Sequence, residues 1–205
     1  MKRDRYHAFL ATVIKRAGRF LLLMAVYFSV SLQGTAGVIS GTFTPLANSP
    51  ANLTGLTVDP VNGYMYAFGV YSDQLYRYNI SANSWSAIST SPEWLQETSL
   101  TKLGDNLYCA SITRGDLLVY NIPGNSWSAI SAPDSDNELY TTNIATDGVN
   151  IFVILDGFEN AKFWRYNVNA GTWTALAPAP AAQDWGGLSY FNGYFYFHEG
   201  NSSYG

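Results

Sequence analysis

Side chains of the types that catalyse reactions are sparse in this chain. His198 stands beside Glu199, and a histidine–carboxylate pair can move protons as a general acid and base. The single cysteine, Cys109, lies in an apolar run, which favours a small buried hydrophobe over a nucleophile. The motifs GxSxG and HExxH and the P-loop are absent. These residues predict no catalytic constellation.

Oxygen ligands for a metal ion gather at one place, residues 134–138, which read Asp-Ser-Asp-Asn-Glu. Carboxylates at alternate positions can hold calcium. The segment lacks the glycine that an EF-hand loop needs and has no distal glutamate in register. We interpret it as a solubilising loop and expect neither a metal nor another cofactor.

A recurring cassette organises the rest of the chain. Each copy has a tyrosine followed by asparagine, and a tryptophan seven places after the tyrosine. The three copies are Tyr78 with Trp85, Tyr120 with Trp127, and Tyr166 with Trp173. A partial copy around Phe43 occupies residues 41–46, so the aromatic marker steps by 42, 42 and 46 residues (43, 85, 127, 173). Self-similarity at this period indicates a blade-by-blade or solenoid fold.

Each repeat divides into four predicted strands separated by turn residues. The expected strands are 53–58, 64–70, 75–80 and 85–88; 99–103, 107–112, 117–122 and 127–130; 142–145, 150–155, 163–168 and 173–176; and 187–191 and 194–198. Four antiparallel strands per repeat are typical of a β-propeller blade. We predict an all-β β-propeller with about three complete blades and partial blades at both ends. The repeats span roughly 47–89, 90–131, 132–177 and, in part, 178–205.

On these features the sequence resembles the Kelch-type β-propeller family, over about residues 41–205. The match consists of the Tyr-to-Trp spacing, the polar residue after the tyrosine, and the turn residue two places before the tryptophan: Asn83, Asn125 and Gly171. The family's Gly-Gly pair after the second strand is replaced by Phe68-Gly69, Ala110-Ser111, Asp156-Gly157 and Glu199-Gly200. The stretch from Val58 to Tyr66 is also reminiscent of NHL or YVTN propellers.

The resemblance implies a ring of about five to seven blades. On this basis we expect the 205 residues to be a truncated reading frame. A small four-bladed ring and an assembly of incomplete rings are the alternatives. The family includes galactose oxidase-like propellers and a sialic-acid epimerase. One histidine after residue 37 does not supply the copper ligands that such an oxidase needs.

The N-terminus is typical of a secretory signal peptide. Residues 1–19 hold six of the eleven Lys and Arg, residues 20–32 are apolar, and small residues follow. We predict a signal peptide over residues 1–36 with cleavage after Ala36; cleavage after Gly37 and an uncleaved anchor are the alternatives. The propeller, residues 38–205, is then expected to be secreted, periplasmic or on the cell surface.

After residue 37 the chain is acidic. It keeps five cations against fourteen acids, so its formal charge is 5 − 14 = −9. A domain so poor in cations cannot neutralise phosphates, which argues against nucleic-acid binding. We expect contact with a membrane only through the signal segment, if it stays uncleaved.

Ligand binding in a repeat fold is expected where the repeats differ. We interpret the repeated Tyr and Trp as inter-blade packing. In a propeller, the turns from fourth to first strand and from second to third open on one face, and unrepeated polar and aromatic residues occur there. The candidate ligand-binding residues are Asn52, Trp94, Gln96, Glu97, Arg114, Tyr140, Glu159, Asp184 and Trp185. Such rings stack on a sugar's apolar face, while amides and carboxylates hold its hydroxyls.

The sequence therefore predicts an exported binding module for a carbohydrate or an extracellular protein. One alternative is a propeller enzyme acting on sugars, epimerase- or hydrolase-like, with Glu97, Asp184 or Glu199 as its acids. A purely structural surface protein is the other.

Overall fold

The computed structural model describes residues 45–96, 98–111, 116–133, 143–155, 162–178 and 187–198. The chain divides into two units, Met1–Ala47 and Asn48–Gly205, and the second contains every described strand. All regular elements of the described residues are β-strands, so the all-β prediction is confirmed. Of the partial copy at residues 41–46, only Pro45 and Leu46 are described, and neither is in a strand.

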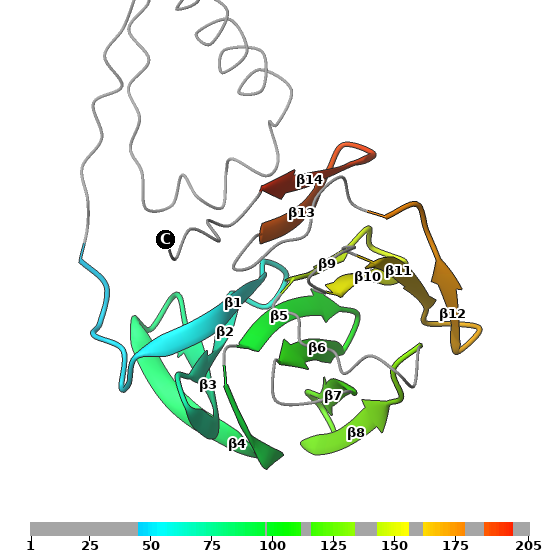
Figure 1. The fold of residues 1–205 in the computed structure, drawn as a ribbon. Helices are drawn as coiled ribbons and strands as arrows, with labels where there is room; N and C mark the ends of the chain where they lie inside the picture. The colour runs from blue at the N-terminus through cyan, green and yellow to red at the C-terminus, as the bar shows by residue number, and fades with distance from the viewer. Residues whose placement is uncertain are drawn as a thin grey trace, which may run out of the picture. The chain divides into compact units, whose positions relative to one another are not determined.

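The strands form three four-stranded sheets and one two-stranded sheet, all with antiparallel neighbours (Figure 1). The first sheet has β1 (Leu53–Asp59), β2 (Tyr64–Gly69), β3 (Ser72–Asn79) and β4 (Ser84–Leu95). The second has β5 (Thr98–Leu103), β6 (Asn106–Ser111), β7 (Leu117–Asn121) and β8 (Ser126–Ile130). The third has β9 (Asn143–Thr146), β10 (Asn150–Leu155), β11 (Lys162–Asn167) and β12 (Thr172–Ala175). The fourth has β13 (Gly187–Phe191) and β14 (Tyr194–His198).

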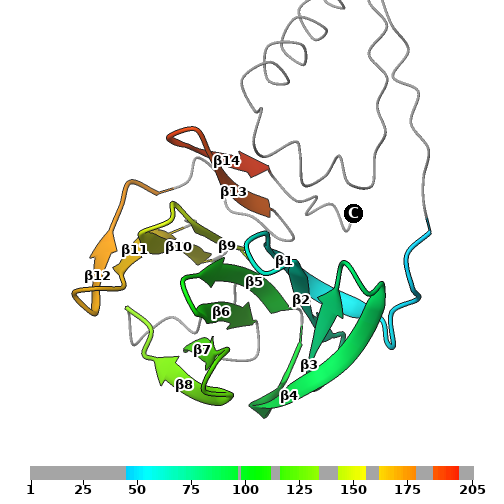
Figure 2. The same ribbon diagram turned by 180° about the vertical axis from the view of Figure 1, so that it is seen from behind.

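The first strands of successive sheets lie side by side. β1 contacts β5, β5 contacts β9, and β9 contacts β13. The last strands, β4, β8 and β12, lie at the outer edge in both views (Figures 1 and 2). Within each full sheet the strands run in sequence order from inner to outer. This is the arrangement of propeller blades, as the repeat predicts.

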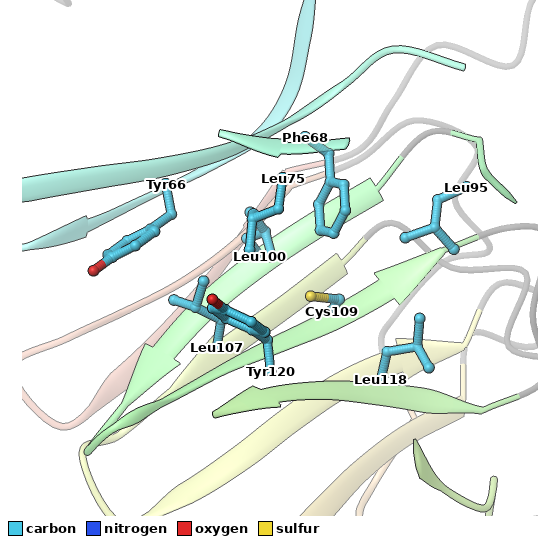
Figure 3. Close-up of a cluster of buried hydrophobic side chains, with 9 residues drawn as sticks. All are labelled: Tyr66, Phe68, Leu75, Leu95, Leu100, Leu107, Cys109, Leu118 and Tyr120. Atoms are coloured by element: carbon cyan, nitrogen blue, oxygen red, sulfur yellow. The ribbon is translucent and has the colours of Figure 1, made fainter. Parts of the chain in front are cut away.

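The cores lie between neighbouring sheets. The cluster between the first and second sheets comprises Tyr66, Phe68, Leu75, Leu95, Leu100, Leu107, Cys109, Leu118 and Tyr120 (Figure 3). The cluster between the second and third includes Tyr108, Ala110, Leu117, Val119, Ile144, Ile151, Val153 and Tyr166. Successive residues of a strand point to opposite faces, so β6 and β7 contribute alternate residues to each cluster. The second sheet is buried on both faces, which explains the nearly continuous apolar runs of these two strands.

The recurring cassette is the turn between the third and fourth strands of a blade, together with the cross-strand pair beside it. Tyrosine and tryptophan are directly paired residues, with ring centroids 5.0, 4.9 and 4.9 Å apart in the three blades. In the first two blades the tyrosine hydroxyl hydrogen-bonds the turn residues Asn83 and Asn125, at 2.6 and 3.0 Å. These asparagines have φ of 48° and 45°, and Gly171 has 65°, a region that favours Asn and Gly. The turn geometry thus accounts for the polar residues of the motif.

Strand bounds match the prediction to within one residue at each end, except in β3 and β4. β3 begins at Ser72 instead of residue 75, and β4 continues to Leu95 instead of ending at residue 88. The reason is a second stretch of pairing, Ser72 with Leu95, beyond an irregularity in the ladder. This pairing joins residues far apart in the sequence, so it cannot be predicted from the local turn residues.

Candidate functional site

Of the nine predicted ligand-binding residues, the structure describes three: Asn52, Trp94 and Gln96. The other six lie outside the described residues; they are Glu97, Arg114, Tyr140, Glu159, Asp184 and Trp185. His198 ends β14, and its neighbour Glu199 lies outside the described residues. The enzyme alternative depends on Glu97, Asp184 and Glu199, so it stays a prediction.

One end of the first sheet brings together the segments that contain the described candidates. Asn52 is exposed just before β1, and its carbonyl accepts a hydrogen bond from the Val70 amide at 2.8 Å. Val70 and Tyr71 form the turn between β2 and β3. Trp94 near the end of β4 donates its indole N–H to the Tyr71 carbonyl, at 2.7 Å. Gln96 follows β4 directly and is partly buried. The two kinds of turn expected to open on one face therefore meet here.

The end of β4 forms an excursion that the described parts of the other blades do not contain. Gln74 pairs with Thr90 and Ser72 pairs with Leu95, so residues 91–94 stand opposite Asp73 alone. β4 has 12 residues, whereas its counterparts β8 and β12 have 5 and 4. Leu95 is completely buried in the core between the first and second sheets, which anchors the far end of the excursion. Extra residues in one strand of a ladder can redirect side chains, and Pro92, Glu93 and Trp94 are exposed here.

The excursion holds an exposed aromatic pair. The rings of Tyr71 and Trp94 are nearly parallel, with centroids 5.8 Å apart and an interplanar angle of 16°. Tyr71 is 54% exposed and Trp94 is 52% exposed. The indole hydrogen bond to the Tyr71 carbonyl fixes the orientation of one ring relative to the backbone of the other residue. The pair therefore presents aromatic surface to solvent in a fixed orientation.

Tyr71 is held in a strained backbone conformation. Its φ is +52°, which costs a residue with a Cβ atom roughly 1 kcal/mol. Asn and Gly occupy the other positive-φ positions of the described chain. This conformation directs the Tyr71 carbonyl toward the indole of Trp94. Strain of this kind is retained where the surroundings enforce it, often at a functional site.

Sequence reasoning missed Tyr71 and placed Trp94 in a loop. The segment from Tyr71 to Asp73 was expected to be a turn, but Ser72 and Asp73 belong to β3. Trp94 lies within β4 rather than in a loop, because the ladder resumes at Leu95 after the excursion. The available signal was a bulky ring at a turn position where small or polar residues are usual.

The described groups at the pair are two aromatic rings and the carboxyl side chains beside them. The rings offer apolar faces, and the exposed side chains of Asp73 and Glu93 next to them in sequence are acidic. Among the described residues no group of three or more His, Cys, Asp or Glu side chains is placed to hold a metal ion. Cys109 is buried, and this burial raises the pKa of its thiol well above the usual value, so the thiolate is disfavoured.

The other ionisable side chains with altered pKa values are structural. Burial by itself would raise the pKa of Asp59, but hydrogen bonds from Asn62 and the Lys102 ammonium outweigh it and lower that pKa. Hydrogen bonds within its own turn, chiefly from Asn150 and Val149, similarly lower the pKa of Asp147 against the effect of burial. Burial raises the pKa of Tyr66, Tyr108 and Tyr120, all of which belong to the inter-sheet clusters.

The described residues thus define an all-β protein built from repeated four-stranded blades, with an exposed aromatic pair on the first blade. No protein-family model matches the chain, and no curated protein matches it either. The part of the chain that the structure describes has no helix of the length and hydrophobicity needed to cross a membrane.

Proposed function

We propose that the chain is an exported Kelch-type β-propeller that serves as a binding module for a carbohydrate or an extracellular protein. The Kelch assignment draws support from the cassette, because its tyrosine and tryptophan pair across the third and fourth strands of each blade. The first blade supplies the contact surface, at the end where β4 makes its excursion.

The single observation that carries the proposal is the exposed stacking of Tyr71 on Trp94. Repeated rings fill the space between blades, so a ring pair that is unrepeated and exposed does not serve the fold in that way. It stands on a segment that only the first blade has among the described residues, and it is maintained at a cost in backbone strain. Surface rings fixed in this manner are suited to contact a partner.

Export follows from the basic and apolar leader of residues 1–36, and we place the propeller in the secreted, periplasmic or cell-surface fraction. The charge of −9 after residue 37 makes nucleic acid an unsuitable ligand. Membrane contact, in this proposal, occurs only through the leader where it stays uncleaved.

The test compares the protein recovered from cells expressing the full chain with its Trp94→Ala variant. Both are applied to an array of immobilised neutral, amino and acidic glycans, and both are used as bait for secreted proteins, with purified candidates then titrated. We expect at least one ligand that the wild type binds and the variant does not. The matched control is Tyr194→Ala, which removes a ring that is 66% exposed on β14. A wild type that binds nothing, or a ligand lost equally in both variants, would overturn the proposal.

A further inference from the structure

We infer that the Tyr71–Trp94 pair takes an uncharged carbohydrate, one of whose pyranose rings lies with its C–H face against the aromatic rings. This inference rests on the proposed function, of which it names the ligand class. It is drawn from the donor and acceptor groups that the pair leaves available, from the charge around it, and from its geometry.

The hydrogen-bonding groups of the pair restrict which ligand surface it can contact. The indole N–H of Trp94 is engaged by the Tyr71 carbonyl at 2.7 Å, so the hydrogen bond that fixes the ring also occupies its donor. The indole has no other polar group. What it presents to a ligand is therefore an electron-rich π face with apolar edges. The matching ligand surface is flat and made of C–H groups, as in a pyranose ring with equatorial hydroxyls.

The carboxyl side chains beside the pair disfavour negatively charged glycans. The exposed carboxylates nearest in sequence are Asp73, opposite the excursion in the β3–β4 ladder, and Glu93, which precedes Trp94. The chain after residue 37 has only five Lys and Arg. A sulfated or uronic-acid polymer would meet like charge here, whereas the hydroxyls of a neutral sugar can donate to carboxylates.

The donors and acceptors around the pair suit a sugar better than a peptide. Proline-rich peptides also lie on aromatic rings, but they dock in grooves and their carbonyls need donors from the surface. The indole donor is occupied, the Tyr71 hydroxyl is the other donor of the pair, and the exposed side chain of Asp73 offers acceptor oxygens. An exposed ring pair with acceptors around it fits a hydroxyl-rich ligand better than a carbonyl-rich one.

The geometry also makes the site ready before the ligand arrives. The two rings lie within 16° of parallel, and Trp94 is fixed by the buried Leu95 on one side and by its bond to the β2–β3 turn on the other. Binding then costs little ordering of the protein side chains. The positive φ of Tyr71 is part of this preorganised geometry.

The experiment is isothermal titration of the protein recovered from cells expressing the full chain. The probes are cellohexaose, chitohexaose and mannohexaose as neutral saccharides, with heparin and decaproline as the charged and peptide alternatives. We expect binding to at least one neutral hexasaccharide and none to heparin. Trp94→Ala and Tyr71→Asn are expected to raise the Kd roughly tenfold or more, since each removes one ring.

One matched control and one fold measurement make the result interpretable. Tyr194→Ala removes an exposed ring elsewhere, so it should bind within about twofold of the wild type. Circular dichroism and thermal melting establish that each variant is folded. Tyr71→Asn retains a residue suited to positive φ, so it tests the ring separately from the backbone.

The outcomes distinguish this inference from the proposed function. Tighter binding of heparin or decaproline than of the neutral sugars, with loss in Trp94→Ala, overturns the assignment to an uncharged carbohydrate and keeps the binding module. Sugar binding that survives Trp94→Ala overturns the site. A folded wild type that binds none of the probes overturns the inference, and a blank result in the partner search as well overturns the proposed function.

Discussion

The tryptophan of the repeated cassette connects a blade to the one before it. Trp127 packs at a tilt against Tyr120 of its own sheet, and its ring also contacts Phe68 of the first sheet, with centroids 5.9 Å apart. Its indole N–H donates to the Ser89 hydroxyl at 3.0 Å. Trp173 likewise donates to the Ser131 carbonyl at 2.9 Å. In the second and third blades the repeated ring is therefore both a packing residue and an inter-blade hydrogen-bond donor.

Replacing Trp127 with alanine is expected to lower the free energy of unfolding by about 3 kcal/mol. This is the lower end of the range for aromatic-to-alanine changes in a core, because the ring is only partly buried. Equilibrium unfolding in urea measures it. Trp94→Ala, at an exposed ring, is the matched control and should cost less than half as much. Equal losses in the two variants would contradict the assignment of Trp127 to packing.

A buried ion pair ties the first two sheets at their other end. Asp59, 1% exposed, accepts hydrogen bonds from the backbone and side-chain nitrogens of Asn62 at 3.3 and 2.9 Å. Its carboxylate lies 3.3 Å from the ammonium of Lys102 on β5, whose side chain is 16% exposed. Removing the cation leaves a buried carboxylate without its countercharge.

Lys102→Met is expected to destabilise the protein by about 3 kcal/mol at pH 7. Because the pKa of Asp59 is lowered on folding, its contribution is present above the unfolded value, about 3.9, and is lost as the pH falls through the folded value. The difference between wild type and variant should therefore shrink below about pH 4. Urea titrations at several pH values measure it, with Asp105→Asn, at an exposed acid, as the control. A pH-independent difference would show that the pair is not the cause.

The close approach of β1 to β5 depends on one glycine. Gly55 lies at the irregularity of the β1–β2 ladder with a φ of +57°. A Cβ atom there would lie 2.3 Å from the Thr98 carbonyl oxygen. That same carbonyl accepts a hydrogen bond from the Thr54 hydroxyl at 3.2 Å. The close backbone contact of the two inner strands requires a residue with no side chain.

Gly55→Ala is therefore expected to cost at least about 3 kcal/mol, the sum of strain at positive φ and displacement of β5. Gly63→Ala is the matched control. Its φ is +70°, yet no atom lies within 4 Å of the added Cβ, so only the strain of about 1 kcal/mol remains. Thermal melting of both variants compares the two costs. If Gly55→Ala lowers the melting temperature no more than Gly63→Ala does, β1 and β5 can move apart without a cost in stability, and the prediction is wrong.

The extent of successful prediction also varies between elements. The sheets could be predicted because the Tyr–Trp pairs and the turn residues Asn83, Asn125 and Gly171 act within one hairpin. The excursion of β4 could not, because it depends on the burial of Leu95 between two sheets and on the contact of Trp94 with a turn 23 residues away. Of the ring pair, Trp94 was named as a ligand-binding candidate because it does not recur with the repeat, and that role stays a prediction. Tyr71 was taken for an ordinary turn residue.

The N-terminal leader predicts a defined first residue for the exported protein. A basic n-region, a 13-residue apolar segment over residues 20–32, and Gly34 and Ala36 at the small-residue positions predict cleavage after Ala36. N-terminal sequencing of the exported protein should therefore begin at Gly37. A start at Val38 would favour the alternative site, and recovery of uncleaved chain in the membrane fraction would contradict secretion.

The bonds from Trp127 to Ser89 and from Trp173 to Ser131 have a consequence for how such a protein changes over generations. Both acceptors stand four places after the tryptophan of their own repeat, 85 to 89 and 127 to 131. A single repeat thus encodes the donor for one neighbour and the acceptor for the other, a head-to-tail arrangement. A gene segment duplicated within this region would bring both halves of the connection with it. Duplication can then add blades without requiring a new inter-blade interface.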